Sequence, residues 1–370
     1  MRFATILLLL TSAGMPLSAQ LTSDSISAAR KYSASHNGTA LIVKERGQLH
    51  FEDYYNGYEK GTPLHIYSGT KSFFGVLAVM AEEDRLLSLD ERAAETLTEW
   101  RDDPRKQAIT LRELLNFTSG LETGFEEIYG RSSDDKIAVA AGLDATRDPG
   151  ASFIYGPGNL NAFVEILRRK LRAKNTTYEA YLRKQLLYPL SVHIHRWRED
   201  DHGNVVPSAG MYTTAQEWMK FGEMINAGGE WNGRRLVKTE SLAQCFRGTG
   251  INPAFGLCFW LNNYAGQPGA READPEEWLD QEPMPEDWRG ACLSQHAPRD
   301  LVCSLGSTFQ RLYLVPSMDL IVIHHGKPGH AFRDADFLRI LFKDAGVPEP
   351  VEPEKKRGLS DLFKGLRKEP

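Results

Sequence analysis

The stretch from Thr70 to Asp84 constrains the fold of this 370-residue chain more than any other part of it. Apolar side chains occupy nearly every side of the helix that this stretch predicts, and they are Phe73, Phe74, Val76, Leu77, Val79 and Met80. A helix that is apolar all round must be covered on all sides by the rest of the protein. The sequence therefore predicts a buried central helix that begins at about Thr70.

Strand signals lie near both ends of the chain. Two β-rich runs between Thr39 and Tyr55 flank Arg46-Gly47, a pattern typical of a hairpin. Near the other end, "QRLYLV" and "LIVIHHG" flank the turn Pro316–Asp319, and a last helix "AFRDADFLRILFKDAG" follows. We expect an α+β fold: one antiparallel β-sheet shared by both ends and flanked by helices, with an inserted helical lobe at about residues 88–200.

The segment between the two hairpins is rich in helix signals. Capping boxes are predicted at Ser88 with Glu91, Thr110 with Glu113, and Thr176 with Glu179. The stretches "LNAFVEILRRKL" and "TAQEWMKFGEMI" have apolar residues at helical spacing. We expect the chain to return to a strand at Phe255–Asn262.

The first 19 residues have the pattern of a secretory signal peptide. Arg2 precedes an apolar core, Phe3 to Leu10, that is too short to span a bilayer, and small residues follow it. We expect cleavage near Ala19 and a periplasmic or secreted protein; a retained membrane anchor is the alternative, because Leu17 is not small. The folded domain would then span residues 20–346, with a disordered tail at residues 347–370.

Composition argues against some partners. The net charge is −5 and the 44 Lys and Arg are scattered, apart from a basic cluster at the end, which argues against a nucleic-acid partner. Nothing gives firm evidence for a protein partner. The cysteines are Cys245, Cys258, Cys292 and Cys303; they form one or two disulfides in an oxidising compartment, or remain buried thiols. Their spacing matches no zinc pattern, and we expect neither a metal nor an organic cofactor.

The stretch from Gly266 to Gly290 is acidic, rich in proline, and contains two tryptophans. It is too long for a hairpin loop, and loops of this length are often lids or mobile surface. We expect a solvated surface insertion, with a lid over the functional site as the alternative.

The stretch "IYSGTKSFFG" places a serine and a lysine three residues apart at the start of the predicted central helix. Residues i and i+3 share one face of a helix, so the Lys71 amine would lie beside the Ser68 hydroxyl. A serine nucleophile needs such a base, and a buried helix start lowers a lysine pKa and offers free backbone N–H groups to an oxyanion. The pattern alone is weak, because Ser68 could equally be a helix cap.

The surroundings of this pair resemble a known family. "YSGTKSF", "LRELLNFTSGL" and "FIYGPGNLNAFVEILRR" occur in an order and spacing similar to those of the serine β-lactamase and penicillin-binding superfamily. More narrowly, the chain is similar to the esterase and amide-hydrolase branch of this superfamily, which includes class C β-lactamases, D-peptidases, family VIII esterases and nylon-oligomer hydrolases. The resemblance covers about Ala40 to Gly346. The resemblance implies that Ser68 is the nucleophile, Lys71 its base, and Tyr155 a proton-relaying group.

The chain departs from that family at two motifs. Pro157 stands where an Asn or Ser is usual, so a substrate contact is missing unless Asn159 replaces it from the next turn. The third motif lacks its Lys or His and aligns with Ser304-Leu305-Gly306. Gly306 would let the strand approach a substrate closely. Lys238-Thr239 is a chance match to the same motif.

The resemblance also implies an oxyanion hole. The backbone N–H of Ser307 would act there beside that of Ser68. Gln310, at the edge of the site, either touches substrate or supports the loop. His324 and His325, at the end of a strand, are expected to be structural.

These features favour a serine hydrolase that cleaves a small ester or amide through an acyl-enzyme. A β-lactamase or a D-amino-acid peptidase is the nearest alternative, but both use the cation that the third motif lacks. A non-catalytic binding protein on the same fold is the other alternative, against which the intact Ser68, Lys71 and Tyr155 argue.

Overall fold

The structure is a computed structural model that describes residues 20–130, 135–281, 287–329 and 332–347. The predicted signal peptide and residues 348–370 of the predicted tail lie outside the described residues. The described α-helices are α1 (Ser23–Ser35), α2 (Thr70–Glu83), α3 (Leu111–Leu115), α4 (Phe125–Tyr129), α5 (Pro157–Arg172), α6 (Tyr178–Leu182), α7 (Ala215–Asn226), α8 (Thr239–Leu242), α9 (Pro275–Leu279) and α10 (Asp334–Phe342). The described strands are β1 (Gly38–Glu45), β2 (Gln48–Tyr54), β3 (Leu64–His65), β4 (Arg196–Trp197), β5 (Met211–Thr213), β6 (Glu230–Trp231), β7 (Arg234–Arg235), β8 (Trp260–Leu261), β9 (Arg271–Glu272), β10 (Ala291–Cys292), β11 (Val302–Gly306), β12 (Gln310–Val315) and β13 (Leu320–Gly326).

One antiparallel sheet joins the two ends of the chain, as predicted. Its strand order is β2-β1-β13-β12-β11-β8, so the N-terminal hairpin pairs directly with the C-terminal one. Arg46 and Gly47 both have positive φ angles, 51° and 74°, which matches the turn needed between two twisted strands. The α+β class and both hairpins are therefore confirmed.

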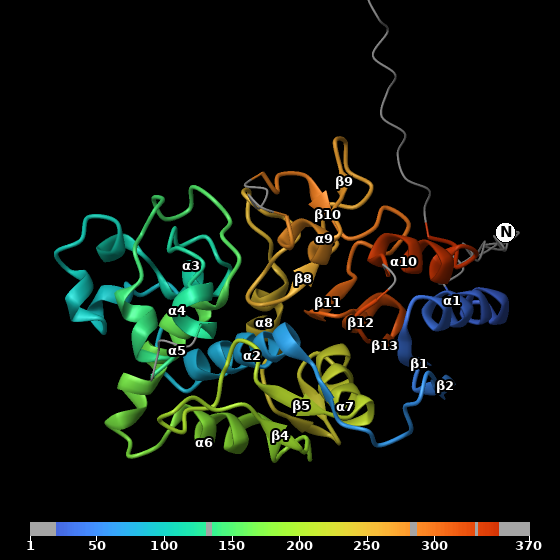
Figure 1. Cartoon of the computed structure of the whole chain (residues 1–370), viewed down its shortest axis with the longest axis horizontal. Coiled ribbons are helices and arrows are strands. Elements are labelled where there is room, and N and C mark those ends of the chain that lie inside the picture. Colours follow the sequence, from blue (N-terminus) through green and yellow to red (C-terminus); the bar gives the residue numbers. More distant parts are fainter. Residues whose placement is uncertain (1–19, 131–134, 282–286, 330–331, 348–370) are drawn as a thin grey trace, which may run out of the picture.

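Helices cover both faces of this sheet (Figure 1). Helix α7 packs on Leu312 and Leu314, whereas Phe337 of α10 stacks on Tyr313. Neighbouring residues of a strand point to opposite faces, so α7 and α10 lie on opposite sides of β12. Helix α1 packs beside α10.

Helix α2 is the buried central helix that the sequence predicts. All residues from Thr70 to Ala81 are buried. Figure 1 shows α2 running through the middle of the molecule, between the sheet and the helices α3, α4 and α5. The first turn of α2 therefore lies where the sheet meets the helices α3, α4 and α5.

Several local predictions were wrong in detail. Thr177, not Thr176, caps α6 by accepting a hydrogen bond from the Ala180 N–H at 3.1 Å. Ser88 and Glu91 do contact each other, but only a short 3₁₀ turn, Ala93–Glu95, follows them. The predicted strand Phe255–Asn262 is reduced to β8, because Cys258 has a φ of 62° that interrupts the extended backbone.

The cysteines and the acidic stretch can also be placed. All four cysteines are buried free thiols, which decides between the two alternatives above. The stretch from Gly266 to Gly290 is not simply solvated, since it forms β9 and α9, and Trp288 is almost fully buried. No helix within the described residues is long and apolar enough to cross a membrane.

Candidate active site

Ser68 lies in a 3₁₀ turn, Tyr67–Gly69, that runs directly into α2. Its side chain caps neither helix, so the structure gives no support to the helix-cap alternative. The preceding Tyr67 has a φ of 45°, a left-handed conformation that costs an aromatic residue roughly 1–2 kcal/mol. Strain of this kind persists where the surrounding structure holds it, and it occurs often at functional sites.

Lys71 points back from the first turn of α2 toward Ser68. Its Nζ lies 2.8 Å from Ser68 Oγ and donates to the Ser208 carbonyl at 2.7 Å. The lysine is 3% exposed, and burial lowers its pKa from 10.5 to about 7. A substantial fraction of the amine is therefore neutral near pH 7 and able to accept a proton from Ser68.

Tyr155 lies just before α5 and lines the same cavity as Ser68. Its ring packs against Phe117 and Trp260, and Lys71 Nζ lies 5.2 Å from the ring centre. Burial raises the pKa of Tyr155, and a hydrogen bond with Ser68 opposes that rise. The phenol is therefore protonated at neutral pH, which suits a proton relay better than a standing tyrosinate.

Two further polar groups complete this arrangement, and sequence reasoning missed both. Tyr129, the last residue of α4, donates to Ser208 Oγ at 2.9 Å. The residue is 42% exposed as a whole, but desolvation around its hydroxyl raises its pKa to about 12. Ser208 thereby connects Tyr129 to Lys71. No local pattern marks either residue, because each lies where a helix or loop ends and neither has a partner at a fixed spacing.

These groups line one cavity of about 390 Å³, to which Ser68, Lys71, Tyr129, Tyr155 and Ser307 all contribute. Leu279 and Asp280 of the acidic stretch line it as well. That stretch therefore reaches the site, as the lid alternative would require. Ser307 lies on the wall of the cavity beside Ser68, where a second backbone N–H for an oxyanion is expected.

Gly306 lies close to the backbone that precedes Ser68. A Cβ at this position would lie 1.9 Å from the Ile66 carbonyl oxygen. The glycine therefore allows β11 to approach the chain just before Ser68, and its approach to a substrate stays a prediction. Ser307, the next residue, lines the same cavity as Ser68.

The structure places Asn159 and Gln310 outside the cavity. The Asn159 side chain is fully buried, accepts a hydrogen bond from Ser119 and donates to the Ile154 carbonyl, so it does not make the substrate contact that Pro157 is unable to make. Pro157 itself begins α5, where a missing N–H costs nothing. Gln310 donates to the Thr308 carbonyl at 2.9 Å and thus supports the loop.

The remaining predicted groups also lie outside the cavity. Lys238 is the N-cap residue of α8, and its backbone N–H donates to Glu83. This position is in keeping with a chance match to the third motif. His324 and His325 are fully buried, and burial lowers their pKa to about 4 and about 3. They are neutral structural side chains.

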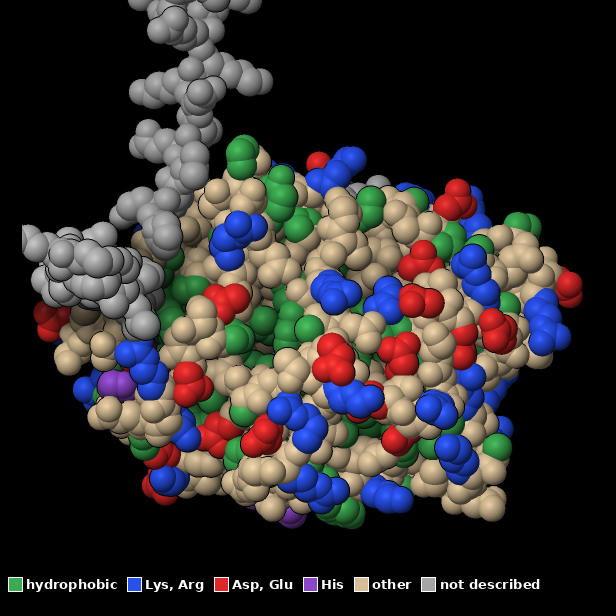
Figure 2. Space-filling model, turned by 180° about the vertical axis from the view of Figure 1, so that it is seen from behind, with side chains coloured by type: hydrophobic (Ala, Val, Ile, Leu, Met, Phe, Trp, Pro, Cys, Tyr) green, Lys and Arg blue, Asp and Glu red, His purple; other side chains and the backbone are tan. Residues whose placement is uncertain are grey.

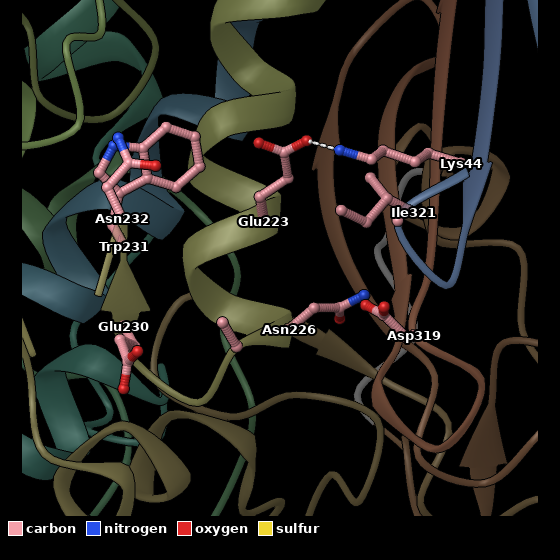
Figure 3. Close-up of a pocket in the computed structure, with 10 residues that line it drawn as sticks. Lys44, Glu223, Asn226, Glu230, Trp231, Asn232, Asp319 and Ile321 are labelled. Atoms are coloured by element: carbon pink, nitrogen blue, oxygen red, sulfur yellow. Dashed lines mark hydrogen bonds and ion pairs between the residues drawn. The ribbon is translucent and has the colours of Figure 1, made fainter. Parts of the chain in front are cut away.

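A second, more open hollow of about 460 Å³ lies beside α7 (Figure 3). In Figure 3, Lys44 and Glu223 point toward one another as an ion pair, and Asn226 lies nearer Asp319. Asn226 donates to the Leu320 carbonyl at 3.0 Å. This hollow holds no serine or cysteine beside a base, so we place the active site at Ser68.

One face of the molecule has no dominant charge. On the face in Figure 2, acidic and basic side chains are interspersed, and neither sign dominates. Within the described residues, no group of three or more His, Cys, Asp or Glu could hold a metal ion.

A family model described as Beta-lactamase matches residues 25–323 of the chain. Among curated proteins, the chain is 31% identical over 156 residues to monacolin J acid methylbutanoyltransferase of Aspergillus terreus. That match covers 35% of this chain and 37% of the relative, so it spans little more than a third of the relative's length.

Solved structures resemble the chain over most of its length. A putative 6-aminohexanoate-dimer hydrolase from Bacillus anthracis matches with a TM-score of 0.64 at 16% identity, over 90% of this chain and 84% of that one. A family VIII carboxylesterase matches with a TM-score of 0.60 at 13% identity, over 88% and 98% of the two chains. At these identities the likeness establishes the fold.

Proposed function

The chain belongs to the beta-lactamase family, and from that premise we propose that it is a serine hydrolase that cleaves an ester or a small amide through an acyl-enzyme on Ser68. The observation that carries the proposal is the contact of 2.8 Å between Ser68 Oγ and a buried lysine whose pKa is about 7. A neutral amine at that distance activates a hydroxyl that is otherwise a weak nucleophile.

The proposed reaction uses these groups in turn. Ser68 Oγ bonds to the substrate carbonyl carbon while its proton passes to Lys71. The N–H groups of Ser68 and Ser307 stabilise the oxyanion. The bond to the leaving group then breaks, and that group takes a proton from Tyr155, which regains one from Lys71. Water attacks the acyl-enzyme through the same groups and releases the acid.

We favour esters and small amides over β-lactams and D-peptides. The cation that those enzymes use near the substrate carboxylate is absent from the third motif, and Pro157 removes an amide contact. The solved structures that resemble the chain include a carboxylesterase, an aminohexanoate-dimer hydrolase and a putative beta-lactamase, so they support the fold and do not choose between these substrates. A p-nitrophenyl ester of a short acid should turn over, and nitrocefin should turn over little or not at all.

A fluorophosphonate probe tests the mechanism directly. It should add to Ser68 in the wild type, as located by peptide mass spectrometry, and should not label Ser68→Ala. A folded wild type that takes up no probe would favour the non-catalytic binding protein. Faster turnover of nitrocefin than of the ester would favour the β-lactamase alternative.

A second candidate is acyl transfer, because the curated relative is described as a methylbutanoyltransferase. An alcohol would then attack the acyl-enzyme in place of water. Adding a short alcohol to the ester assay and measuring the ratio of transester to free acid separates the two. Free acid alone would support the hydrolase.

A further inference from the structure

The turn that carries Ser307 has an unfavourable backbone. Gly306 and Gln310 are paired across β11 and β12, so Ser307, Thr308 and Phe309 form the connection. Thr308 and Phe309 have φ angles of 59° and 63°. A β-branched and an aromatic residue both disfavour this left-handed region, so other groups must hold the turn in place.

Glu276 of α9 supplies one such group from outside the turn. One of its carboxylate oxygens accepts from the Thr308 N–H at 2.6 Å, and the other accepts from the Phe309 N–H at 3.2 Å. The two strained residues therefore present consecutive backbone donors to a single carboxylate. Hydrogen bonds from backbone N–H groups to a charged acceptor are about twice as strong as neutral ones.

Arg311 connects Glu276 to the residue before Ser307. Its Nη2 donates to Glu276 at 2.9 Å, and its Nη1 donates to the Gly306 carbonyl at 2.7 Å. The peptide bond is planar and trans, so the Ser307 N–H points away from the Gly306 carbonyl. A carbonyl held by Arg311 therefore fixes the direction in which the Ser307 N–H points.

We infer that Glu276 is a positioning residue for the oxyanion hole, acting through the turn Ser307–Phe309. The inference rests on the proposed function, in which the Ser307 N–H binds the oxyanion. With Arg311, Glu276 holds the backbone on both sides of Ser307, while Gln310 supports the turn from within. The acidic stretch thus contributes to catalysis through α9, and not only by lining the cavity.

The test is Glu276→Gln, which keeps the size of the side chain but replaces one acceptor oxygen with an NH₂ group. That group would face either a backbone N–H or Arg311, all of which are donors. We expect kcat for an ester to fall about 10- to 100-fold, less than the loss of a whole oxyanion donor, with KM changed by less than about threefold.

A thionoester of the same acid adds a readout that a purely structural role would not change. Sulfur accepts hydrogen bonds weakly, so an intact oxyanion hole prefers the oxygen ester. The ratio of kcat/KM for the oxygen ester to that for the thionoester should fall in Glu276→Gln. This ratio does not depend on how much of the variant is folded.

Glu277→Gln is the matched control on the same helix, because Glu277 is 53% exposed and, among the described residues, its carboxylate pairs with the surface residue Arg333. It should leave kcat and the ester ratio unchanged. An unchanged ester ratio in Glu276→Gln, or an equal fall in both variants, would overturn the inference. A wild type in which Ser68 takes up no fluorophosphonate would instead overturn the proposed function, and this inference with it.

Discussion

Lys71 and Arg311 are both buried cations, yet their surroundings differ. Arg311 is 0% exposed and donates to the carboxylates of Asp334 and Glu276. Burial alone would lower its pKa, but these two carboxylates outweigh burial and raise it. Lys71 is almost as buried, but within the described residues its amine forms hydrogen bonds only with the neutral oxygens of Ser68 and Ser208, beside the uncharged Tyr155 ring, and its pKa falls to about 7.

The difference separates a cation that holds structure from one that can react. A compensated guanidinium never gives up its proton, so Arg311 can only position what it touches. An uncompensated buried amine is driven toward its neutral form, which is the form that accepts a proton. Only Lys71 therefore suits the part of a base, and the same substitution at the two positions should have opposite consequences.

Lys71→Met should give the largest effect. The methionine fills a similar volume but removes the base, so kcat for an ester should fall by about 10³-fold or more. Because the uncompensated amine no longer has to be buried, the melting temperature should stay the same or rise. Ester kinetics together with a thermal melt measure both; full activity in this variant would show that Lys71 is not the base.

Arg311→Met should instead destabilise the protein. It leaves the carboxylates of Asp334 and Glu276 without their cation. Removing one partner of a buried ion pair lowers the free energy of unfolding by about 3–5 kcal/mol. Urea denaturation should show this as a lower midpoint. A stability equal to that of the wild type would mean that the ion pairs of Arg311 with Asp334 and Glu276 do not stabilise the fold.

The pH dependence of ester turnover should follow the ionisation of Lys71 and not that of Arg311. Activity should rise about tenfold per pH unit below pH 7 and level off above it, as the amine loses its proton. Since the folded pKa of about 7 lies below the ordinary 10.5, the unfolded chain binds more protons between these values.

Wild-type stability, relative to Lys71→Met, should therefore rise between pH 7 and pH 10.5 by at most about 1.4 kcal/mol per unit. Below pH 7 the lysine is protonated in both states, and the difference should be constant. Urea denaturation at pH 7 and pH 9 measures it. An equal difference at both values would place the folded pKa of Lys71 near its ordinary value.

Tyr129→Phe should give the smallest effect. It removes the hydrogen bond to Ser208 Oγ, worth about 1 kcal/mol, and leaves the Ser208 carbonyl in contact with Lys71. We expect kcat to fall about three- to tenfold, because that fall corresponds to a rise of about 1 kcal/mol in the activation free energy. A loss as large as that of Lys71→Met would show that Tyr129 itself transfers a proton.

The parts of the molecule that follow local rules were predictable from the sequence. The spacing of Ser68 and Lys71 fixes their proximity once a helix begins there, and alternating apolar residues around a turn define each hairpin. The burial of α2 follows from its composition alone.

The parts that depend on distant contacts were not predictable in this way. Asn159 was expected in the site by counting from Pro157, but the helix that begins there directs it toward Ser119. Tyr129 and Ser208 meet only in the folded chain. Glu276 lies in a stretch whose composition suggested a solvated surface, and only tertiary structure shows its contact with the Ser307 turn.

The sheet order has a consequence for synthesis. Strand β1 lies between β2 and β13, and Leu41 is paired with His324, more than 280 positions along the chain. On the ribosome, the nascent N-terminal hairpin must therefore keep one edge without its partner until β13 has emerged. Such long-range pairing slows folding and exposes an apolar strand to aggregation in the meantime.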